Sequence, residues 1–554
     1  MRSGSKGNWR SWPISQRSRT HLRLWALLLL LALLPIWDCG QGEQEAREGH
    51  QSSRYGGTLV VGIRVDVDAL NELVSTSAVA QDIIELLFLR LTEYDENLNI
   101  VPKLAESWEF SSDHRVLTYH LRRDVFWTDG LPTTAHDVAY TYELMADPVI
   151  AYPGISDFDF VERVEVMDDY TINFIFKKPY ADQLGDTRLV VLPKHLLEKV
   201  PPDKMKFADF NRKPVGNGPF KLESWASQDR LILVPNDGYY EGRPPLDRVV
   251  FRVIPDETTR RVELETGGID LLPTVPTSDQ GRWMEDDRVR VWKYPGRDYV
   301  YVGWNLLNPL FGDKRVRRAL TMAIDREGII QGLRFGLGQL CTGPIVPTSW
   351  AYNESIRPYP FDPERAKRLL AEVGWRDSDG DGLLDRGGYP FSFTMTIITD
   401  NRISEEVSTV IQAAFQDLGL RMDIKSLEWN VFLNKTQAKE FDACILAWRG
   451  SFVINPTPVW HSKSIQGKYN YISFSNPEVD DLIERGRLAV DREAAKKIWY
   501  RFQEIIAEEQ PYTFLYVAQD CHAIHRRFRG VHMDIRGVYK NLHQWWVPRQ
   551  ERKY

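Results

Sequence analysis

Cysteine is scarce in this sequence, which has only four among 554 residues: Cys39, Cys341, Cys444 and Cys521. No two of them lie at short spacing and no histidine cluster accompanies them, which excludes the usual zinc motifs. With Cys39 set aside, the other three allow at most one intrachain disulfide. We expect buried thiols or a single bridge rather than thiol chemistry.

The sequence also lacks the short motifs of common enzyme classes. It contains no G-x-S-x-G, no H-E-x-x-H and no phosphate-binding P-loop. His461 adjoins Ser462, and His522 and His525 follow Cys521 closely, but a lone histidine in a polar loop is more often exposed or hydrogen-bonded than catalytic. We therefore expect a protein that binds without catalysis and needs no cofactor.

Basic residues are fewer than acidic residues in this chain. The chain carries 70 Lys and Arg against 77 Asp and Glu, a formal net charge of -7. Residues 1–38 hold six basic side chains and one acidic one, so the chain without them carries a formal charge of -12. Such an acidic protein is a poor nucleic-acid binder, so we expect no nucleic-acid partner.

Long apolar runs are absent except for one, Leu24 to Trp37, which follows the basic start. It is shorter than the roughly 20 residues of a membrane-spanning helix, and we interpret residues 1–38 as an export signal. Residues 39–56 are polar and predict a flexible tether. Cys39 resembles the lipid-modified first residue of bacterial lipoproteins, but Asp38 and Trp37 depart from the small residues of that pattern. Lipid anchoring, simple cleavage and an uncleaved anchor stay open; each places the protein in the periplasm or on the outer face of the cell membrane.

What the sequence does contain is a large apolar and aromatic fraction, 43% and 12%, enough for two or three domains. After the predicted tether, "GGTLVVGI" has the pattern of a strand and "AVAQDIIELLFLRLTEY" has the pattern of a helix. Strand pairs dominate from 161 to 253. From about 301 to 515, strands alternate with helices. These patterns predict an α/β fold.

The run "FDACILAW", residues 441–448, predicts a buried strand that ends in polar residues. Ligands of open α/β sheets lie just outside the carboxyl ends of strands. Trp448, Arg449, Gly450 and Ser451 are therefore a candidate ligand-binding wall.

Five segments resemble, in family order, the peptide- and nickel-type solute-binding proteins of bacterial ABC transporters: "LAESWEFSSDHRVLTYHLRRDVFWTDGLPTTAHDVAYTYELM", "GNGPFKLESW", "NDGYYEGRPPLDRVVFRVIPDETTRRVELETGGIDLL", "FGDKRVRRALTMAIDREGII" and "NPEVDDLIERGR". The resemblance implies a monomeric, two-lobed clamp of the type II periplasmic-binding-protein class. Lobe I would comprise residues 57–95, 210–300 and 515–554, an inserted subdomain 96–209, and lobe II 301–514. Such a protein captures a peptide-like solute and delivers it to an ABC permease in the inner membrane.

In peptide-binding members of that family, a Trp is followed after two residues by an Asp that pairs with the ligand's amino terminus. Here the Trp is Trp448 and the Asp position holds Ser451. A buried ammonium needs a counter-charge, so either another acid, such as Asp66 or Asp68, replaces the missing one, or the ligand lacks a free amine. A blocked peptide, an oligosaccharide or a metal chelate would satisfy the second case, and a sensor or chaperone role on the same fold also stays open.

Two further residues complete the predicted site. Trp304 and Asn305 end a strand of the second lobe and are expected in the cleft beside Trp448. Arg449 either meets a ligand carboxylate as a planar donor or points to solvent.

The stretch "DSDGDGLLD" resembles an EF-hand calcium loop in its first nine positions: Asp377, Asp379, Asp381 and Asp385 occupy positions 1, 3, 5 and 9. Position 12, normally a bidentate Glu, is Gly388. We favour a solvated Asp/Gly turn without metal, with weak calcium binding as the alternative.

Overall fold

The computed structural model describes residues 54–152, 154–276, 279–399 and 401–553. The predicted export signal, Cys39 and nearly all of the predicted tether lie outside the described residues. From Tyr55 onward the chain forms one unit. Within the described ranges, no helix is both long and apolar enough to span a bilayer.

An 11-stranded mixed sheet carries most of the chain. It grows from apolar segments such as "TLVVGI", which is buried on both faces and pairs in parallel with its neighbour, as expected of a central strand. The strands, in spatial order, are β17 (Arg421–Leu427), β16 (Ser392–Ile398), β18 (Ala443–Arg449), β12 (Val289–Trp304), β19 (Tyr512–His525), β11 (Leu271–Leu272), β1 (Thr58–Ile63), β10 (Arg248–Val253), β9 (Arg230–Pro235) and β8 (Phe220–Ala226), with β13 (Gly338–Leu340) on β19.

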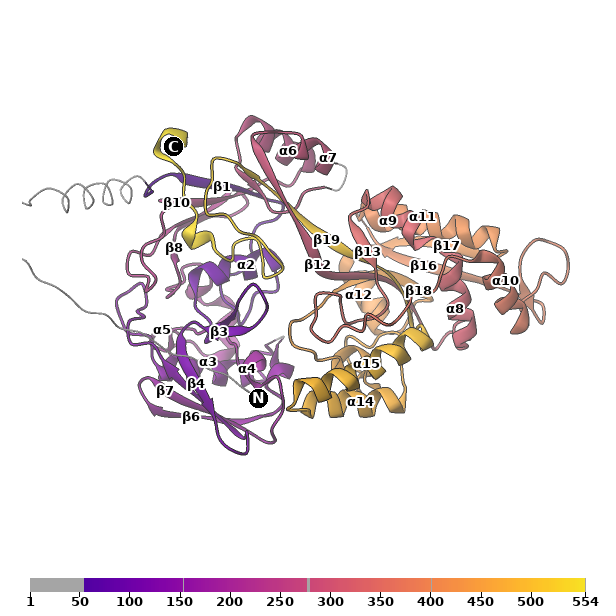
Figure 1. Cartoon of the computed structure of the whole chain (residues 1–554), viewed down its shortest axis with the longest axis horizontal. Coiled ribbons are helices and arrows are strands. Elements are labelled where there is room, and N and C mark those ends of the chain that lie inside the picture. Colours follow the sequence, from indigo (N-terminus) through magenta and orange to yellow (C-terminus); the bar gives the residue numbers. More distant parts are fainter. Residues whose placement is uncertain (1–53, 153, 277–278, 400, 554) are drawn as a thin grey trace, which may run out of the picture. The chain divides into compact units, whose positions relative to one another are not determined.

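The two longest strands, β12 and β19, pair antiparallel and lie side by side in Figure 1. Their register shifts between Pro295 and Tyr299, where three residues of β12 face the single residue Ala518 of β19. Pro295 has no backbone N–H to donate to the ladder, which favours a bulge at this point. Because of the bulge, Arg297 and Asp298 lie outside the regular pairing with β19, and their side chains are available for other contacts.

Smaller sheets complete the strand inventory. A four-stranded antiparallel sheet falls wholly within the predicted inserted subdomain: β4 (Ala105–Phe110), β5 (Val116–Leu121), β7 (Thr171–Phe176) and β6 (Val161–Asp168). Two-stranded ladders join β2 (Thr92–Tyr94) to β3 (Ile100–Pro102) and β14 (Asp385–Arg386) to β15 (Tyr389–Pro390). The boundaries of the two lobes themselves stay predictions.

The helices begin at polar capping residues. Ser77, Asp256, Asp313, Asp362 and Asp491 each accept a hydrogen bond from a backbone N–H of the first turn of their helix. The helices are α2 (Ala78–Leu87), α3 (Ala135–Ala146), α4 (Gln183–Asp186), α5 (Lys194–Leu197), α6 (Glu257–Thr266), α7 (Gln280–Met284), α8 (Lys314–Ala323), α9 (Arg326–Arg334), α10 (Pro363–Glu372), α11 (Arg402–Asp417), α12 (Trp429–Gln437), α13 (Thr457–Trp460), α14 (Pro477–Leu488) and α15 (Arg492–Glu509). Short 3₁₀ turns are η1 (Ile155–Phe158), η2 (Pro202–Phe207), η3 (Asp209–Asn211), η5 (Ser462–Ser464), η6 (Leu542–Gln544) and η7 (Arg549–Glu551).

Residues 314–334 form two helices, α8 and α9, rather than one. Ile324 between them is extended, and Asp325 caps α9 by accepting a hydrogen bond from the N–H of Gly328 at 2.8 Å. The Asp325 carboxylate takes the backbone N–H of Gly328, so α8 ends and a new helix begins at this point.

The side chains of each central strand alternate between cores on the two faces of the sheet. Val61 of β1 packs into a core shared with the four-stranded sheet, and Val60 packs into a separate core with α6. Along β12, Trp304 packs into the core beneath α8 and α11, whereas Tyr301 packs into the core beneath α14 and α15. The sheet is therefore covered on both faces.

The three described cysteines are free thiols and all are buried. Burial raises the pKa of Cys341 and of Cys521 to about 12 each, and it also raises that of Cys444. The buried-thiol alternative is confirmed, and the disulfide alternative is not.

A buried ion pair joins the residue before β11 to the segment after β19, and it generates a stability prediction. Asp270 accepts from Arg527 at 2.7 Å and from the N–H of Val60 at 3.0 Å, and both side chains are at most 3% exposed. We expect Arg527→Ala to lower the free energy of unfolding by about 3–5 kcal/mol, because it leaves a buried carboxylate unpaired. Urea titration measures the effect. Arg485→Ala, which breaks an exposed pair with Asp481, should cost less than about 1 kcal/mol, and equal losses in both variants would contradict this account.

Candidate functional site

The loop after β18 is the centre of the candidate site. β18 pairs with β12 along its whole length, so Trp448 lies opposite Tyr299 and Arg449 lies opposite Asp298. The strand ends at Arg449, and the chain continues as Gly450 and Ser451. This stretch lines cavities that other elements complete, as expected at the carboxyl end of a strand.

Arg297 and Asp298, on the bulge of β12, hold this loop. Asp298 receives two parallel hydrogen bonds from Arg449, at 2.8 and 3.1 Å, the planar geometry that guanidinium and carboxylate favour. Arg297 donates to the carbonyl oxygen of Gly450 at 3.2 Å and accepts from the N–H of Gly450 at 2.9 Å. Its guanidinium lies 4.2 Å from the centre of the Phe452 ring. The bulge therefore fixes the loop by charge, hydrogen bonds and a cation–π contact.

A cavity of about 440 Å³, called here the polar cavity, opens beside the Arg449–Asp298 pair. The ends of β1, at Ile63, and of β18, at Arg449, both line it. The remaining walls come from α2, α6, β12, β19, β11 with the segment 273–276 after it, and the C-terminal segment around residues 535–539. Two strand ends from distant parts of the sequence thus meet at one cavity.

Three carboxylates of the polar cavity, Asp82, Asp520 and Glu257, have no hydrogen-bond or ion-pair partner among the described residues, and the first two also have raised pKa values. Asp82 is open to the cavity, yet the surrounding protein desolvates it, and this desolvation together with nearby Glu85 raises its pKa to about 7. Burial, followed by the charge of Asp298, raises the pKa of Asp520 as well. Both groups would be stabilised by a cation in the cavity.

The neighbouring charged cavity, of about 210 Å³, is different because its two glutamates, Glu85 and Glu93, are paired with basic side chains. Lys540 pairs with Glu93 and, at 3.4 Å, with Glu85, while Arg188 pairs with Glu93 at 3.0 Å and Arg90 with Glu85 at 3.3 Å. Burial alone would raise the pKa of Glu85, but Lys540 and Arg90 lower it to about 2. This network joins α2 and β2 to the C-terminal segment.

A third cavity, the apolar pocket, has a volume of about 150 Å³ and lies behind Gly450 and Ser451. Its walls are mainly aromatic and aliphatic, and Trp448 forms one of them, stacked on Tyr471 at 6.2 Å between ring centres. A side cavity of about 180 Å³ shares Ser451 with the apolar pocket and Arg297 with the polar and charged cavities. Ser451 and Arg297 therefore stand where the cavities meet.

Four of the predicted site residues, Trp448, Arg449, Gly450 and Ser451, lie together and line these cavities. Arg449 is already paired with Asp298, so neither of the two predicted roles, a free donor or a solvent-pointing side chain, describes it fully. The Ser451 hydroxyl accepts from the N–H of Val453 at 3.2 Å and brings no charge.

The other four predicted site residues do not line these cavities. Their side chains make hydrogen bonds that hold the fold together instead. Trp304 is fully buried in a core and donates to Thr513 at 3.1 Å. Asn305 donates to the carbonyl of Phe441 at 2.7 Å. Asp66 accepts from Trp225 at 3.0 Å, and Asp68 accepts from Ser75 at 2.6 Å, so both acids serve loop structure.

Eight charged residues of the polar cavity were not predicted: Arg64, Asp82, Glu257, Arg260, Arg297, Asp298, Asp520 and Arg536. The dipeptide Pro295-Gly296 inside a strand pattern is a sequence signal for the bulge that presents Arg297 and Asp298. Asp82, on a helix, and Asp520, on a strand, carry no comparable signal.

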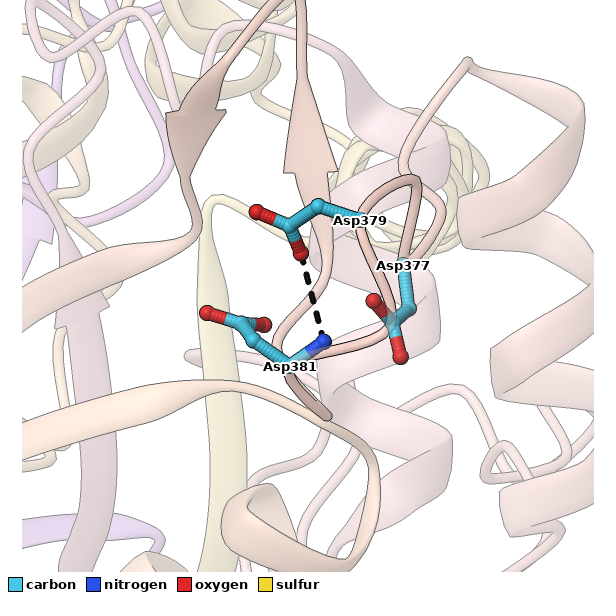
Figure 2. A group of neighbouring side chains, drawn as sticks. All are labelled: Asp377, Asp379 and Asp381. Carbon is cyan, nitrogen blue, oxygen red and sulfur yellow. Dashed lines mark hydrogen bonds between the residues drawn. The ribbon is translucent and has the colours of Figure 1, made fainter.

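The acidic turn predicted as a calcium alternative is exposed, and Figure 2 shows Asp377, Asp379 and Asp381 on one loop. Their carboxylate oxygens lie within 4.8 Å of one another. Asp385, in contrast, accepts from the hydroxyl of Ser378 at 2.6 Å and does not belong to this group. Weak calcium binding at the three aspartates stays a prediction.

Comparison with known proteins identifies the family of the chain. The model of the bacterial extracellular solute-binding proteins, family 5, matches residues 99–470. The chain belongs to this family. The oligopeptide-binding protein AppA of Bacillus subtilis is 32% identical over 545 residues, which covers 96% of this chain and all of that protein. Heme-binding protein A of Haemophilus influenzae is 29% identical and covers 77% of this chain and 80% of its own length.

Solved structures give the same result for the fold. The Bacillus subtilis AppA structure in complex with a nonapeptide has a TM-score of 0.79 and 33% identity, and the match covers 89% of this chain and 99% of that chain. NikZ of Campylobacter jejuni in complex with Ni(L-His) has a TM-score of 0.78 and 25% identity, with 88% and 99% covered. The predicted family and α/β fold class are confirmed, and the family is one of solute-binding proteins, as the expectation of binding without catalysis requires.

The raised pKa of Asp82 predicts a pH dependence of stability. The folded protein raises the pKa of Asp82 to about 7, whereas in the unfolded chain this carboxyl keeps its ordinary pKa of 3.8. The folded state therefore binds more protons between these values, and the contribution of Asp82 to the free energy of unfolding falls as pH rises from 4 to 7. We expect Asp82→Asn to gain stability relative to the wild type across this window. Urea titrations at several pH values test this, and a difference that stays constant from pH 4 to 7 would contradict it.

Proposed function

We propose that the protein captures a peptide with a free amino terminus in the polar cavity and delivers it to a membrane permease. The observation that carries the proposal is the presence of two unpartnered carboxylates whose pKa values are raised, Asp82 and Asp520, in a cavity lined by the ends of β1 and β18. Membership of the solute-binding family and the likeness to the oligopeptide-binding protein AppA support it.

Asp82 and Asp520 replace the counter-charge that Ser451 does not supply. A protonated amine between them receives two charged acceptors and lowers the cost of keeping both carboxylates ionised. Asp66, considered as a substitute from the sequence, accepts a hydrogen bond from Trp225 of β8 instead, and Asp68 accepts one from Ser75 of its own loop.

Arg297 is the complementary group for the oxygens of the peptide. It lines three cavities, and its guanidinium contacts a backbone carbonyl and an aromatic ring rather than a carboxylate. Arg449 is less available to a ligand, because its guanidinium already donates two hydrogen bonds to Asp298. A peptide backbone or carboxylate that reaches Arg297 while its amine meets Asp82 contacts both α2 and β12. Such a ligand favours the conformation in which these elements surround it, and that conformation is what a permease recognises.

A metal chelate is the second ligand class that relatives suggest, but the cavity offers little to a metal. His522 is the imidazole that lines the polar cavity in the described structure. Its two ring nitrogens already contact Tyr294 and the carbonyl oxygen of Pro273. The site therefore favours an organic cation.

The amine proposal is tested by calorimetry with pentaalanine and N-acetyl-pentaalanine on the purified mature protein. We expect pentaalanine to bind and the acetylated peptide to bind more weakly. Asp82→Asn and Asp520→Asn should each weaken pentaalanine binding by about 1.5–3 kcal/mol, roughly tenfold or more, because each removes a charged acceptor. Neither should affect the acetylated peptide.

Asp377→Asn, on the exposed acidic turn, is the matched control and should change neither affinity. Equal binding of the free and acetylated peptides, or no effect of either aspartate variant, would contradict the assignment of the amine to this cavity.

We also propose that residues 1–38 direct export and that Cys39 carries a lipid anchor on the outer face of the cell membrane. The extracellular solute-binding family and the apolar run before Cys39 support this. Cys39→Ala should move the protein from the membrane fraction to the soluble exported fraction. A wild-type protein found in the soluble exported fraction would contradict the anchor.

A further inference from the structure

The apolar pocket behind Ser451 contains one polar group that its surroundings do not satisfy. The side-chain oxygen of Asn455 is buried and has no hydrogen-bond partner in the described structure. Asn455 belongs to the wall of the pocket. A buried acceptor without a donor is costly, and such groups in folded proteins usually have a partner supplied by water or a ligand.

The rest of the wall is suited to a ring. Tyr299, Trp460 and Phe502 are each at most 4% exposed to solvent and form an aromatic floor. Val346 and Ile454 add aliphatic surface. The volume of about 150 Å³ is the size of a cavity that holds one benzene ring, and it is small for the two fused rings of an indole.

The pocket is also in the right place for a side chain of the ligand. It shares Arg449 with the polar cavity and Ser451 with the charged and side cavities. A ligand whose amine and backbone lie in the polar cavity can therefore direct one side chain past Arg449 into the pocket.

We infer that the apolar pocket is a specificity site for a single aromatic side chain that bears a hydrogen-bond donor, the phenol of a tyrosine, with Asn455 as the acceptor. The inference rests on the proposed function, since it assigns one side chain of the proposed peptide ligand. The ring replaces water against the apolar walls, and the phenol hydroxyl donates to the orphaned oxygen of Asn455.

The test is calorimetry with pentaalanine and its variants that carry one Tyr, Phe or Trp at each of the five positions. At one position we expect Tyr to bind roughly tenfold or more tightly than Ala, because a buried ring contributes that much. Phe should bind about three- to tenfold more weakly than Tyr, since it lacks the donor. Trp should bind more weakly than Tyr, because its indole exceeds the pocket.

Two variants assign the preference to this pocket. Asn455→Leu keeps the size of the side chain and removes the acceptor, so Tyr and Phe should bind equally. Val459→Phe fills the pocket, so the preference for a ring should disappear. Val490→Phe, at an exposed valine outside the cavities described above, is the matched control and should behave as the wild type.

The outcomes separate this inference from the proposed function. If pentaalanine binds but no position distinguishes Tyr from Ala, the inference is overturned and the proposed function stands. If Tyr is preferred but neither Asn455→Leu nor Val459→Phe changes the preference, the pocket is wrongly assigned. Asn455→Leu alone decides the point if Val459→Phe does not fold. Failure of every peptide to bind would overturn the proposed function and this inference with it.

Discussion

The antiparallel pairing of β12 with β19 is the interaction on which the rest of the structure depends. These two strands join the β1–β8–β9–β10 side of the main sheet to the β16–β17–β18 side. Their continuous ladder holds both sides in one sheet, and its single large irregularity, between Pro295 and Tyr299, lies at the candidate site. A bulge at this point turns Arg297 and Asp298 out of the regular ladder, where they bind the loop after β18.

The acidic side chains of the polar cavity and of the charged cavity differ in whether they have partners. This difference is the basis for assigning a cationic ligand to the polar cavity. In the charged cavity beside it, buried acids and bases pair with one another, which leaves little for a ligand to gain. In the polar cavity, Asp82 and Asp520 are left without a partner and their pKa values are raised. Unpaired groups of this kind reduce the stability of the empty protein, and a ligand of opposite charge recovers that free energy on binding.

The sequence allowed the fold and part of the site to be predicted. The run that ends at Trp448 predicted β18 correctly, and the polar residues after it identified the loop, because apolar strands and the ends of strands leave local signals. The interpretation of Trp304 was wrong because a position near a strand end does not reveal which face a side chain takes. Trp304 follows Val302 into the core under α8, on the alternate face from Tyr301. Asp82 and Asp520 could not be found, since their meeting in one cavity depends on contacts between segments more than 400 residues apart in the chain.

A crystal structure of the mature protein with bound pentaalanine tests the central claim most directly. The account predicts the amino terminus of the peptide within about 3.2 Å of a carboxylate oxygen of Asp82 or Asp520, with peptide oxygens facing Arg297. A peptide bound elsewhere, or a polar cavity occupied by solvent alone while the peptide binds in solution, would contradict it.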